Sequence, residues 1–172
     1  MGTLVVPHVR HHSSWLVAAA EFAGARMDGS GMDDPPDVAA LTHRDAFEAL
    51  VERLLADADE DTPRPADRVP ATALWIVDDG QVMGSLQIRH RLTPWLLEQG
   101  GHIGYSVRPS ARRRGHASAA LRDALPIAHG LGIERVLVVC DEDNYGSRTV
   151  IERNGGVYED SRAGKRRYWL DA

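Results

Sequence analysis

The run from Val136 to Cys140 is the feature of the sequence that most restricts the fold, because every residue in it is apolar. A strand with one face in water alternates apolar and polar residues, whereas an unbroken apolar run is typical of a strand buried on both faces. Further layers must then cover both faces of the sheet. A helix is predicted shortly before this run, at His116–Gly130, so the sequence favours an α/β protein.

The remaining strands are predicted from β-branched runs and from alternation of apolar with polar residues. They are expected at Leu4–Val6, Thr72–Val77, Gln81–Ile88, Gly101–Val107, Val157–Glu159 and Arg166–Leu170. The dipeptide Asp79-Gly80 lies between two apolar runs, which is a strong signal for a tight hairpin turn. The strands on either side of it are therefore expected to pair.

The other helices are predicted from apolar residues spaced three and four apart. They are expected at Trp15–Ala25, from Thr42 to Leu55 and at Tyr145–Arg153, with one helical turn within Arg91–Gln99. Thr42 precedes Asp45 by three residues, which is a variant of the capping box. Pro126 should kink or end the helix that contains it, because proline has no backbone N–H group to donate.

Composition excludes several classes of function. The 172 residues, 43% of them hydrophobic and 26% charged, fit a single globular domain. The net charge of −5 argues against a nucleic-acid binder, which would show a basic face. Cys140 is the single cysteine, so an internal disulfide and a cysteine-based zinc site are excluded, and no metal is expected. No apolar run approaches the ~20 residues of a membrane span, and a cytoplasmic location is the expectation.

An arginine-rich loop between a predicted strand and a predicted helix carries the clearest chemical signal. Between Arg108 and Arg122 there are five arginines and no acid, although the whole chain is acidic. A strand–helix junction offers free N–H groups and a positive dipole end, and Gly115 permits close approach of a ligand. The spacing matches neither a P-loop nor a dinucleotide fingerprint. The loop is interpreted either as a site for a di- or polyphosphate or as a solvated basic turn.

A second polar loop, Cys140–Ser147, begins at the end of the buried strand. Ligands of open α/β sheets bind beyond the carboxyl ends of strands, so both loops are expected to face one crevice. Asn144 is interpreted either as the N-cap of the following helix or as an amide that bonds an extended ligand.

Together, these segments resemble the GNAT N-acetyltransferase superfamily. Arg112-x-x-Gly115-x-Ala117 resembles its Gln/Arg-x-x-Gly-x-Gly/Ala motif, and Asn144-x-x-Ser147 resembles its Asn-x-x-Ala/Ser motif. The likeness is greatest to a bacterial branch of the superfamily.

The resemblance, which extends over about Leu74 to Val157, implies a mixed, mainly antiparallel twisted sheet flanked by helices on both sides. A single domain over residues 1–172 is expected. Residues 1–70 would form the acceptor side and residues 71–172 the acetyl-CoA-binding core. Many relatives pair as dimers, so a homodimer is one expectation.

The resemblance also implies acetyl-CoA as co-substrate, with its pyrophosphate on the backbone amides of the arginine-rich loop. The pantetheine arm would lie between the strands Tyr105–Val107 and Val136–Cys140, which splay apart. An amine of a small molecule or a peptide would attack the thioester directly. The residues implied to bind the coenzyme are Tyr105, Val107, Arg112, Arg113, Arg114, Gly115, His116, Ala117, Asn144 and Ser147.

The sequence departs from the family at the acid that protonates the leaving thiolate. Many members have a tyrosine seven residues after the motif asparagine, and Ile151 stands there in this chain. Tyr145 and Ser147 are the nearest hydroxyl side chains, and Ser147 is the stand-in candidate. For the base, His102 is the first candidate because its ordinary pKa of about 6.5 suits proton removal. Glu98 is the alternative carboxylate, and His102 could equally be a structural histidine of its strand.

Three functions stay open on the sequence. The first is acetyl-CoA-dependent N-acetyl transfer. The second is a GNAT-fold sensor or interaction module that binds acetyl-CoA with little catalysis, and the third is a binder of another phosphate ligand. The segment Asp28–Asp61 holds eleven acids against Arg44 and Arg53, and forms either a solvated face or a wall for a cationic acceptor. Asp33, Asp34 and Asp37 are the carboxylates through which that acceptor would be tested.

Overall fold

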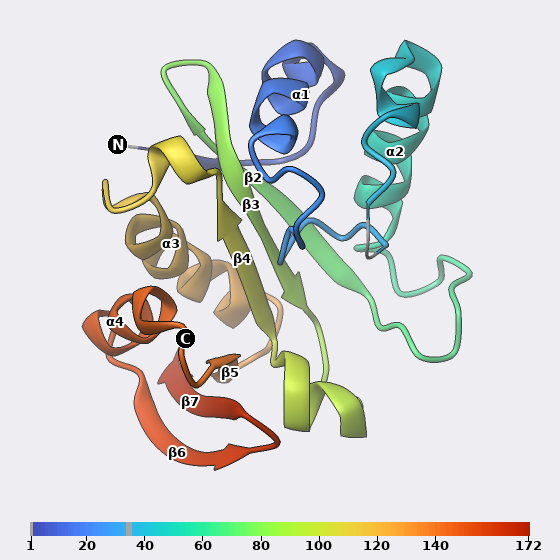
Figure 1. Cartoon of the computed structure of the whole chain (residues 1–172). Coiled ribbons are helices and arrows are strands. Elements are labelled where there is room, and N and C mark those ends of the chain that lie inside the picture. The colour runs from blue at the N-terminus through green and yellow to red at the C-terminus, as the bar shows by residue number, and fades with distance from the viewer. Residues whose placement is uncertain (1, 34–35) are drawn as a thin grey trace.

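The computed structural model describes residues 2–33 and 36–172, and its described part forms one seven-stranded sheet (Figure 1). The strand order is β1-β2-β3-β4-β5-β7-β6, and neighbours are antiparallel except for the parallel pair β4–β5. The strands are β1 Thr3–Val5, β2 Ala71–Asp78, β3 Gln81–Arg89, β4 Ile103–Val107, β5 Arg135–Asp141, β6 Val157–Arg162 and β7 Lys165–Asp171. Asp79 and Gly80 both have positive φ, as a tight hairpin turn requires, and they join β2 to β3.

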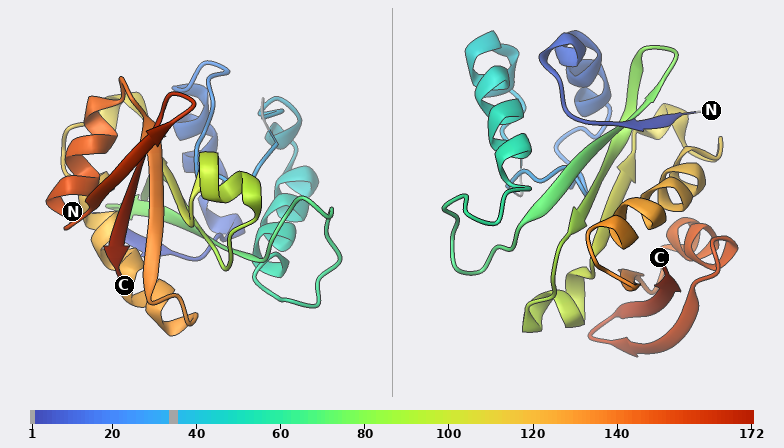
Figure 2. Two further views of the ribbon diagram at one scale, coloured as in Figure 1. Left: turned by 90° about the horizontal axis from the view of Figure 1, so that it is seen from below. Right: turned by 180° about the vertical axis from the view of Figure 1, so that it is seen from behind.

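Helices cover both faces of this sheet, as predicted. They are α1 His12–Ala20, α2 Arg44–Ala56, α3 His116–Gly130 and α4 Tyr145–Arg153. Short helical turns lie at Val9–His11, Ala40–Thr42, Leu96–Gly100 and Pro109–Ala111, the third of them a π-helical turn. Figure 2 shows α1 and α2 side by side, with α3 and α4 near the other half of the sheet. None of the helices in the described part of the chain is long and apolar enough to cross a bilayer.

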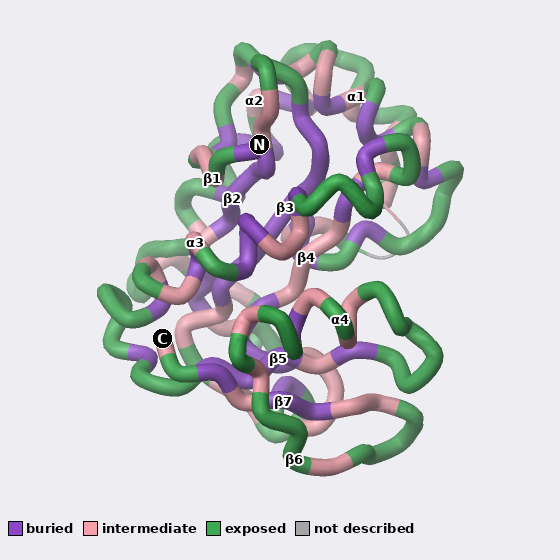
Figure 3. The backbone as a smooth tube through the Cα atoms, turned by 90° about the vertical axis from the view of Figure 1, so that its left-hand side faces the viewer, coloured by how far each residue is buried: buried purple, intermediate pink, exposed green. Residues whose placement is uncertain are grey.

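The core is divided by the sheet into two apolar clusters. Leu74 and Ile76 of β2 pack in one cluster with α3 and α4, whereas Ala73 and Trp75 pack in the other with α1 and α2. This alternation follows from the two-residue period of a strand. Figure 3 shows the buried backbone running through β2 and β3, between the two sets of helices.

The boundaries of the first two helices differ from the prediction. The helix α1 begins three residues before Trp15 and ends at Ala20, because Ala23 and Gly24 adopt positive φ and turn the chain. The capping box at Thr42 does not form. The Thr42 hydroxyl donates to the carbonyl of Ala39 at 2.7 Å, and His43 is the N-cap of α2 without a side-chain cap.

Pro126 does not end α3, which continues to Gly130. Proline removes one backbone donor, and the last turn of this helix is held by further bonds. The N–H of Leu131 donates to the carbonyls of Ile127 and Ala128, and Gly132 donates to His129. A proline one turn before a well-capped helix end is therefore tolerated here.

The strands β4 and β5 touch at one point and then separate. Their single register pair is Ile103 with Val138, supported by the His102 N–H, which donates to the carbonyl of Leu137 at 2.7 Å. Gly101 makes this approach possible, since it has a φ of 67° and an added Cβ would lie 2.5 Å from the Leu137 carbonyl oxygen. Beyond Ile103, the side of β4 that faces β5 makes no ladder pairs with it, so the sheet opens.

Candidate functional site

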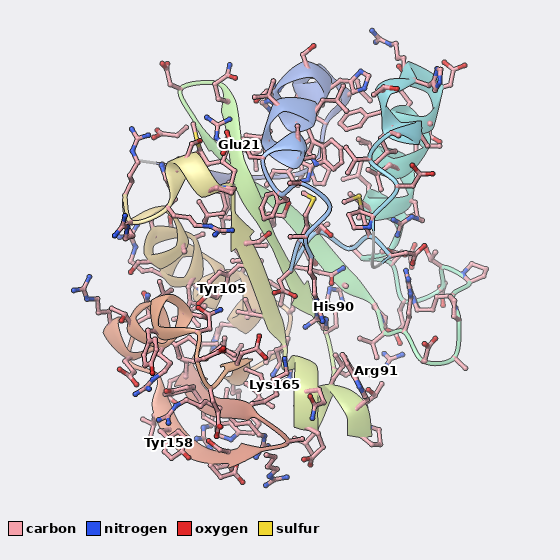
Figure 4. All side chains as sticks on the ribbon, in the orientation of Figure 1. Glu21, His90, Arg91, Tyr105, Tyr158 and Lys165 are labelled. Carbon is pink, nitrogen blue, oxygen red and sulfur yellow. The ribbon has the colours of Figure 1, made fainter. Side chains whose placement is uncertain are left out.

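A large cavity of ≈880 Å³ lies where β4 and β5 separate. One side is formed by β4 and the start of α3, and the other by the end of β5 and the start of α4. Figure 4 labels Tyr105 on β4 and Lys165 on β7, which both line the cavity. Of the residues implied to bind a coenzyme, the lining includes Tyr105, Val107, Arg112, Arg113, Gly115, His116, Ala117, Asn144 and Ser147, but not Arg114.

The loop before α3 forms a concave arrangement of free backbone donors. Arg113 has a φ of 59° and Gly115 a φ of 86°, so two left-handed residues alternate within three positions. The N–H groups of Arg113, Arg114 and Gly115 donate no hydrogen bond within residues 2–33 and 36–172. Alternation of this kind is typical of a nest, in which successive N–H groups turn to one side, and we call Arg113–Gly115, at the positive end of α3, the nest.

Neighbouring side chains hold this nest in place. The Arg112 side-chain Nε donates to the carbonyl of Val107 at 3.0 Å, which ties the loop to the end of β4. The N–H and hydroxyl of Ser110 both donate to the Glu21 carboxylate at 2.8 Å. These two bonds lower the pKa of Glu21, so the carboxylate remains an ionised acceptor at neutral pH.

A network of hydroxyl and amide groups lies across the cavity from the nest. The Asn144 side-chain oxygen accepts from the N–H of Ser147 at 3.0 Å, so Asn144 is the N-cap of α4 as well as a lining residue. Its Nδ2 makes no hydrogen bond in the described part of the chain. The Ser147 hydroxyl lies 2.7 Å from the Tyr105 hydroxyl. Burial raises the pKa of Tyr105 well above its ordinary value, so this phenol keeps its proton.

The end of β5 adds a thiol and an ion pair. Cys140 is buried and free, and burial raises the pKa of its thiol, which makes it a neutral wall of the cavity. The Lys165 ammonium pairs with the Asp141 carboxylate, and both residues line the cavity. Cys140 and Asp141 belong to the loop that the sequence predicted to face the crevice, whereas Lys165 was missed, because β7 reaches this position only through its pairing with β5.

The two residues predicted as bases lie outside the cavity lining. His102 is 8% exposed, and its Nδ1 accepts from the N–H of Leu137 at 2.9 Å. Burial, and after it the charge of Arg89, lower the pKa of His102 to about 4, which leaves it a weak base at neutral pH. Glu98 accepts from Arg162 at 2.6 Å in an ion pair. The structure thus gives both residues bonding partners within the fold rather than access to the cavity.

Tyr145 and Ser147, the two hydroxyl side chains considered as the acid, line the cavity, whereas Ile151 at the usual tyrosine position does not. Tyr145 is 70% exposed at the start of α4, and Ser147 follows two residues later. Ile151 is completely buried in the core cluster below α4, in contact with the place where a Gly156 side chain would be. In this chain, that helix position faces the core.

A smaller cavity of ≈100 Å³ adjoins the large one, and both are lined by Arg26, Asp28 and Arg89. Its wall is the loop after α1, which packs on β4 so tightly that an added Cβ at Gly29 would lie 2.2 Å from the Gly104 carbonyl oxygen. The rest of the lining is Met27, Gly29, Ser30, Gly31, Met32, Asp33, Pro36 and Gln87.

The acidic segment therefore contributes Asp28 and Asp33 to the smaller cavity. Asp33 pairs with Arg68, and Asp37 accepts from the N–H of Ala40 at 3.1 Å in a local turn. Asp34 lies outside the described residues. No group of three or more histidine, cysteine or acidic side chains in the described ranges is arranged to hold a metal ion.

Several solved acetyltransferase structures share this fold. Mycobacterium smegmatis RimJ in complex with CoA-disulfide has a TM-score of 0.70, with 20% identity over 98% of this chain and 81% of that one. The Microcin C7 self-immunity acetyltransferase MccE, in complex with acetyl-CoA and AMP, has a TM-score of 0.67, with 14% identity over 99% and 92%. The ribosomal L7/L12 α-N-protein acetyltransferase RimL, in complex with coenzyme A, has a TM-score of 0.64, with 18% identity over 98% and 92%.

The sequence itself matches a known family. No curated protein gives a significant sequence match, but residues 34–157 match the family described as an acetyltransferase (GNAT) domain. This match covers most of the chain, and the mainly antiparallel sheet with helices on both faces is the fold of the solved acetyltransferases. The chain therefore belongs to the GNAT acetyltransferase family.

Proposed function

We propose that this protein is an acetyl-CoA-dependent N-acetyltransferase that acts on an amine of a small molecule or a peptide. The observation that carries the proposal is a single cavity reaching from the nest at Arg113–Gly115 to the separated strands β4 and β5. Its two ends suit the two ends of acetyl-CoA: free N–H groups and arginines for pyrophosphate, and unpaired strand edges for the amide-containing arm. Complexes of MccE with acetyl-CoA and of RimL with coenzyme A support this assignment.

In the proposed reaction, the neutral amine nitrogen of the acceptor attacks the thioester carbonyl carbon. The new C–N bond forms, the C–S bond breaks, and the electron pair leaves on sulfur. The amine loses one proton and the thiolate gains one. Asp28 lines both cavities, and we propose it as the carboxylate toward which the proton of the amine moves, directly or through water.

The Tyr105–Ser147 hydroxyl pair is proposed to support the leaving thiolate. The ordinary pKa of a thiol is about 8.5 and that of a phenol about 10, so complete proton transfer from tyrosine to thiolate is already uphill. Burial raises the pKa of Tyr105 further, which favours hydrogen-bond donation over proton transfer. The pair would therefore stabilise the developing negative charge on sulfur, and water would supply the proton.

Thermal unfolding with acetyl-CoA is the first test of the proposed function. A ligand at ~100 times its Kd adds about 2.7 kcal/mol to the free energy of unfolding. For a domain of this size, we expect Tm to rise by roughly 5–10 °C with acetyl-CoA, and much less with ATP or inorganic phosphate. Equal shifts with all three ligands would favour a general phosphate binder. A shift with acetyl-CoA but no release of coenzyme A with any amine would favour the sensor or interaction module.

Replacement of Ser147 by alanine tests the hydroxyl pair. Because Ser147→Ala removes the 2.7 Å contact to Tyr105, we expect kcat to fall about 10-fold with little change in the KM for acetyl-CoA. Ser161→Ala is a matched control, since it breaks a second tyrosine–serine hydroxyl contact, 3.1 Å from Tyr158, outside the cavity. Equal kcat values for the two variants would remove the pair from the mechanism.

A further inference from the structure

Arg89 is a charged side chain whose guanidinium is only partly hydrogen-bonded within the fold. Its Nη1 donates to the carbonyls of Gly100 at 2.9 Å and Gly101 at 3.1 Å. Its Nε and Nη2 make no hydrogen bond, and no carboxylate lies within ion-pair distance, anywhere in residues 2–33 and 36–172. Burial lowers the pKa of Arg89, which records the cost of this desolvated cation.

The nearby acid is engaged elsewhere. Asp28 contributes a favourable charge to Arg89, but its carboxylate lies 2.7 Å from the Arg26 side chain in a half-exposed ion pair. Arg89 therefore lines both cavities, and no carboxylate in the described part of the chain pairs with its guanidinium. Arginine presents a planar fork that matches a carboxylate or a phosphate.

The position of Arg89 places this unmatched charge next to the expected reaction centre. The Arg89 N–H donates to the carbonyl of His102 at 2.7 Å, and its Nη2 lies 3.3 Å from where a Gly104 side chain would begin. Both contacts flank Ile103, the residue at which β4 and β5 separate. Arg89 is on β3, the strand next to β4. A group bound to Arg89 would therefore lie one strand from Ile103, close to where we expect the thioester of a coenzyme bound in the opening.

We infer that the acceptor amine carries a carboxylate within a few bonds of its nitrogen, and that Arg89 binds this carboxylate. The inference rests on the proposed function and adds the class of the acceptor. The smaller cavity, of ≈100 Å³, fits a compact molecule. The Asp28 carboxylate is half exposed in its ion pair with Arg26, so it can accept a further hydrogen bond from the cationic amine of the same acceptor. An acceptor with both charges also suits the two carboxylates of this cavity, Asp28 and Asp33, without requiring a purely cationic substrate. Free α-amino acids are the simplest members of this class.

A binding comparison on the wild-type protein tests the inference without any substitution. Calorimetry would be performed on the protein with and without coenzyme A, using a panel of α-amino acids and the carboxamide of each. At least one amino acid is expected to bind about 10-fold more tightly than its carboxamide, because a charge-assisted bond to Arg89 is lost in the amide. Equal binding of acids and amides, including no binding by either, would overturn the inference for free amino acids. Together with equal or no binding of the aspartyl and alanyl peptides described below, it would overturn the inference as a whole.

A third arm separates a free amino acid from a protein N-terminus. Peptides that begin with aspartate and have an amidated C-terminus offer the same amine and a nearby side-chain carboxylate. Tighter binding of these peptides than of free amino acids would support the inferred carboxylate and identify the acceptor as an acidic N-terminus. Equally tight binding of peptides that begin with alanine would overturn the inference, because they have no such carboxylate.

Substitutions then assign the effect to Arg89. Arg89→Gln should abolish the discrimination between acid and amide, whereas Arg89→Lys should retain part of it because the positive charge remains. Arg91→Gln is the control, since Arg91 is an exposed arginine paired with Glu60 and lines neither cavity. Thermal unfolding of each variant shows whether it folds. Discrimination that survives in folded Arg89→Gln would overturn the assignment.

The design distinguishes a failure of this inference from a failure of the proposed function. If the wild-type protein does not bind coenzyme A but distinguishes acids from amides, the result contradicts the proposed acetyltransferase. If it binds coenzyme A but does not distinguish acids from amides, the result contradicts only the inference that the acceptor carries a carboxylate.

Discussion

The Gly115→Glu variant is expected to fold and to bind acetyl-CoA roughly 100-fold or more weakly. Gly115 has a φ of 86°, and an added Cβ would meet no heavy atom within 4 Å, so the side chain would extend into open space at the nest. A carboxylate there repels a pyrophosphate and competes for the free N–H groups. Loss of two charge-assisted hydrogen bonds, at about 1.5 kcal/mol each, is sufficient for a change of this size.

Gly132→Glu is the matched control for this variant. Gly132 has a φ of 83°, also with nothing within 4 Å of an added Cβ, and it lies beyond the opposite end of α3. Both substitutions therefore place the same charge on a left-handed residue, with a similar cost of about 1–2 kcal/mol. Calorimetric Kd values that agree between the two variants would show that the nest does not bind the coenzyme.

The second large effect is expected at the contact between β4 and β5. In Gly101→Val, a β-branched residue would take a φ of 67°, with its Cβ 2.5 Å from the Leu137 carbonyl oxygen. Backbone strain costs about 1–3 kcal/mol, and relief of the clash must also separate the only paired residues of these two strands. A total of about 3 kcal/mol corresponds to a fall in Tm of roughly 6–12 °C for a domain of this size.

Gly155→Val measures the cost of backbone strain without the steric clash. Gly155 has a φ of 87°, but nothing lies within 4 Å of an added Cβ, so only the conformational cost applies. Differential scanning calorimetry should show a clearly smaller fall in Tm for this variant. If both valine variants melt at the same temperature, the close approach of Gly101 to β5 contributes nothing to stability.

Local patterns in the sequence were sufficient to predict most of the strands and helices, and the resemblance to the GNAT superfamily implied how they are arranged in the sheet. The hairpin at Asp79-Gly80 and the strand around Val136–Cys140 follow from neighbouring residues, and the structure confirms both. The start of α1 and the cap of α2 could not be read in the same way. Each depends on which of several adjacent polar residues bonds the backbone, and tertiary packing decides between them.

The lining of the large cavity was predictable where a motif marks it and not where distant segments create it. The lining around Gly115 and Asn144 follows from motif residues. Arg89 carries no motif, and its exposure to the cavity depends on the loop after α1 folding back over β4. His102 shows the reverse problem, because alternation predicted it on a strand that lines the site, whereas it lies one residue before β4. Only the structure shows that its ring is already bonded to Leu137.

The division of the core by the sheet has a consequence for how such a chain can change over evolutionary time. Trp75 belongs to the layer of α1 and α2, and its neighbour Ile76 to the layer of α3 and α4, so each layer has its own packing constraints. Substitutions that reshape the loop after α1, which lines the smaller cavity with Arg89, can accumulate without disturbing the residues that pack behind Gly115. If the proposed function holds, descendants of this chain can acquire new acceptors without changing the layer behind Gly115, and an alignment of relatives should show the greater divergence in residues 1–70.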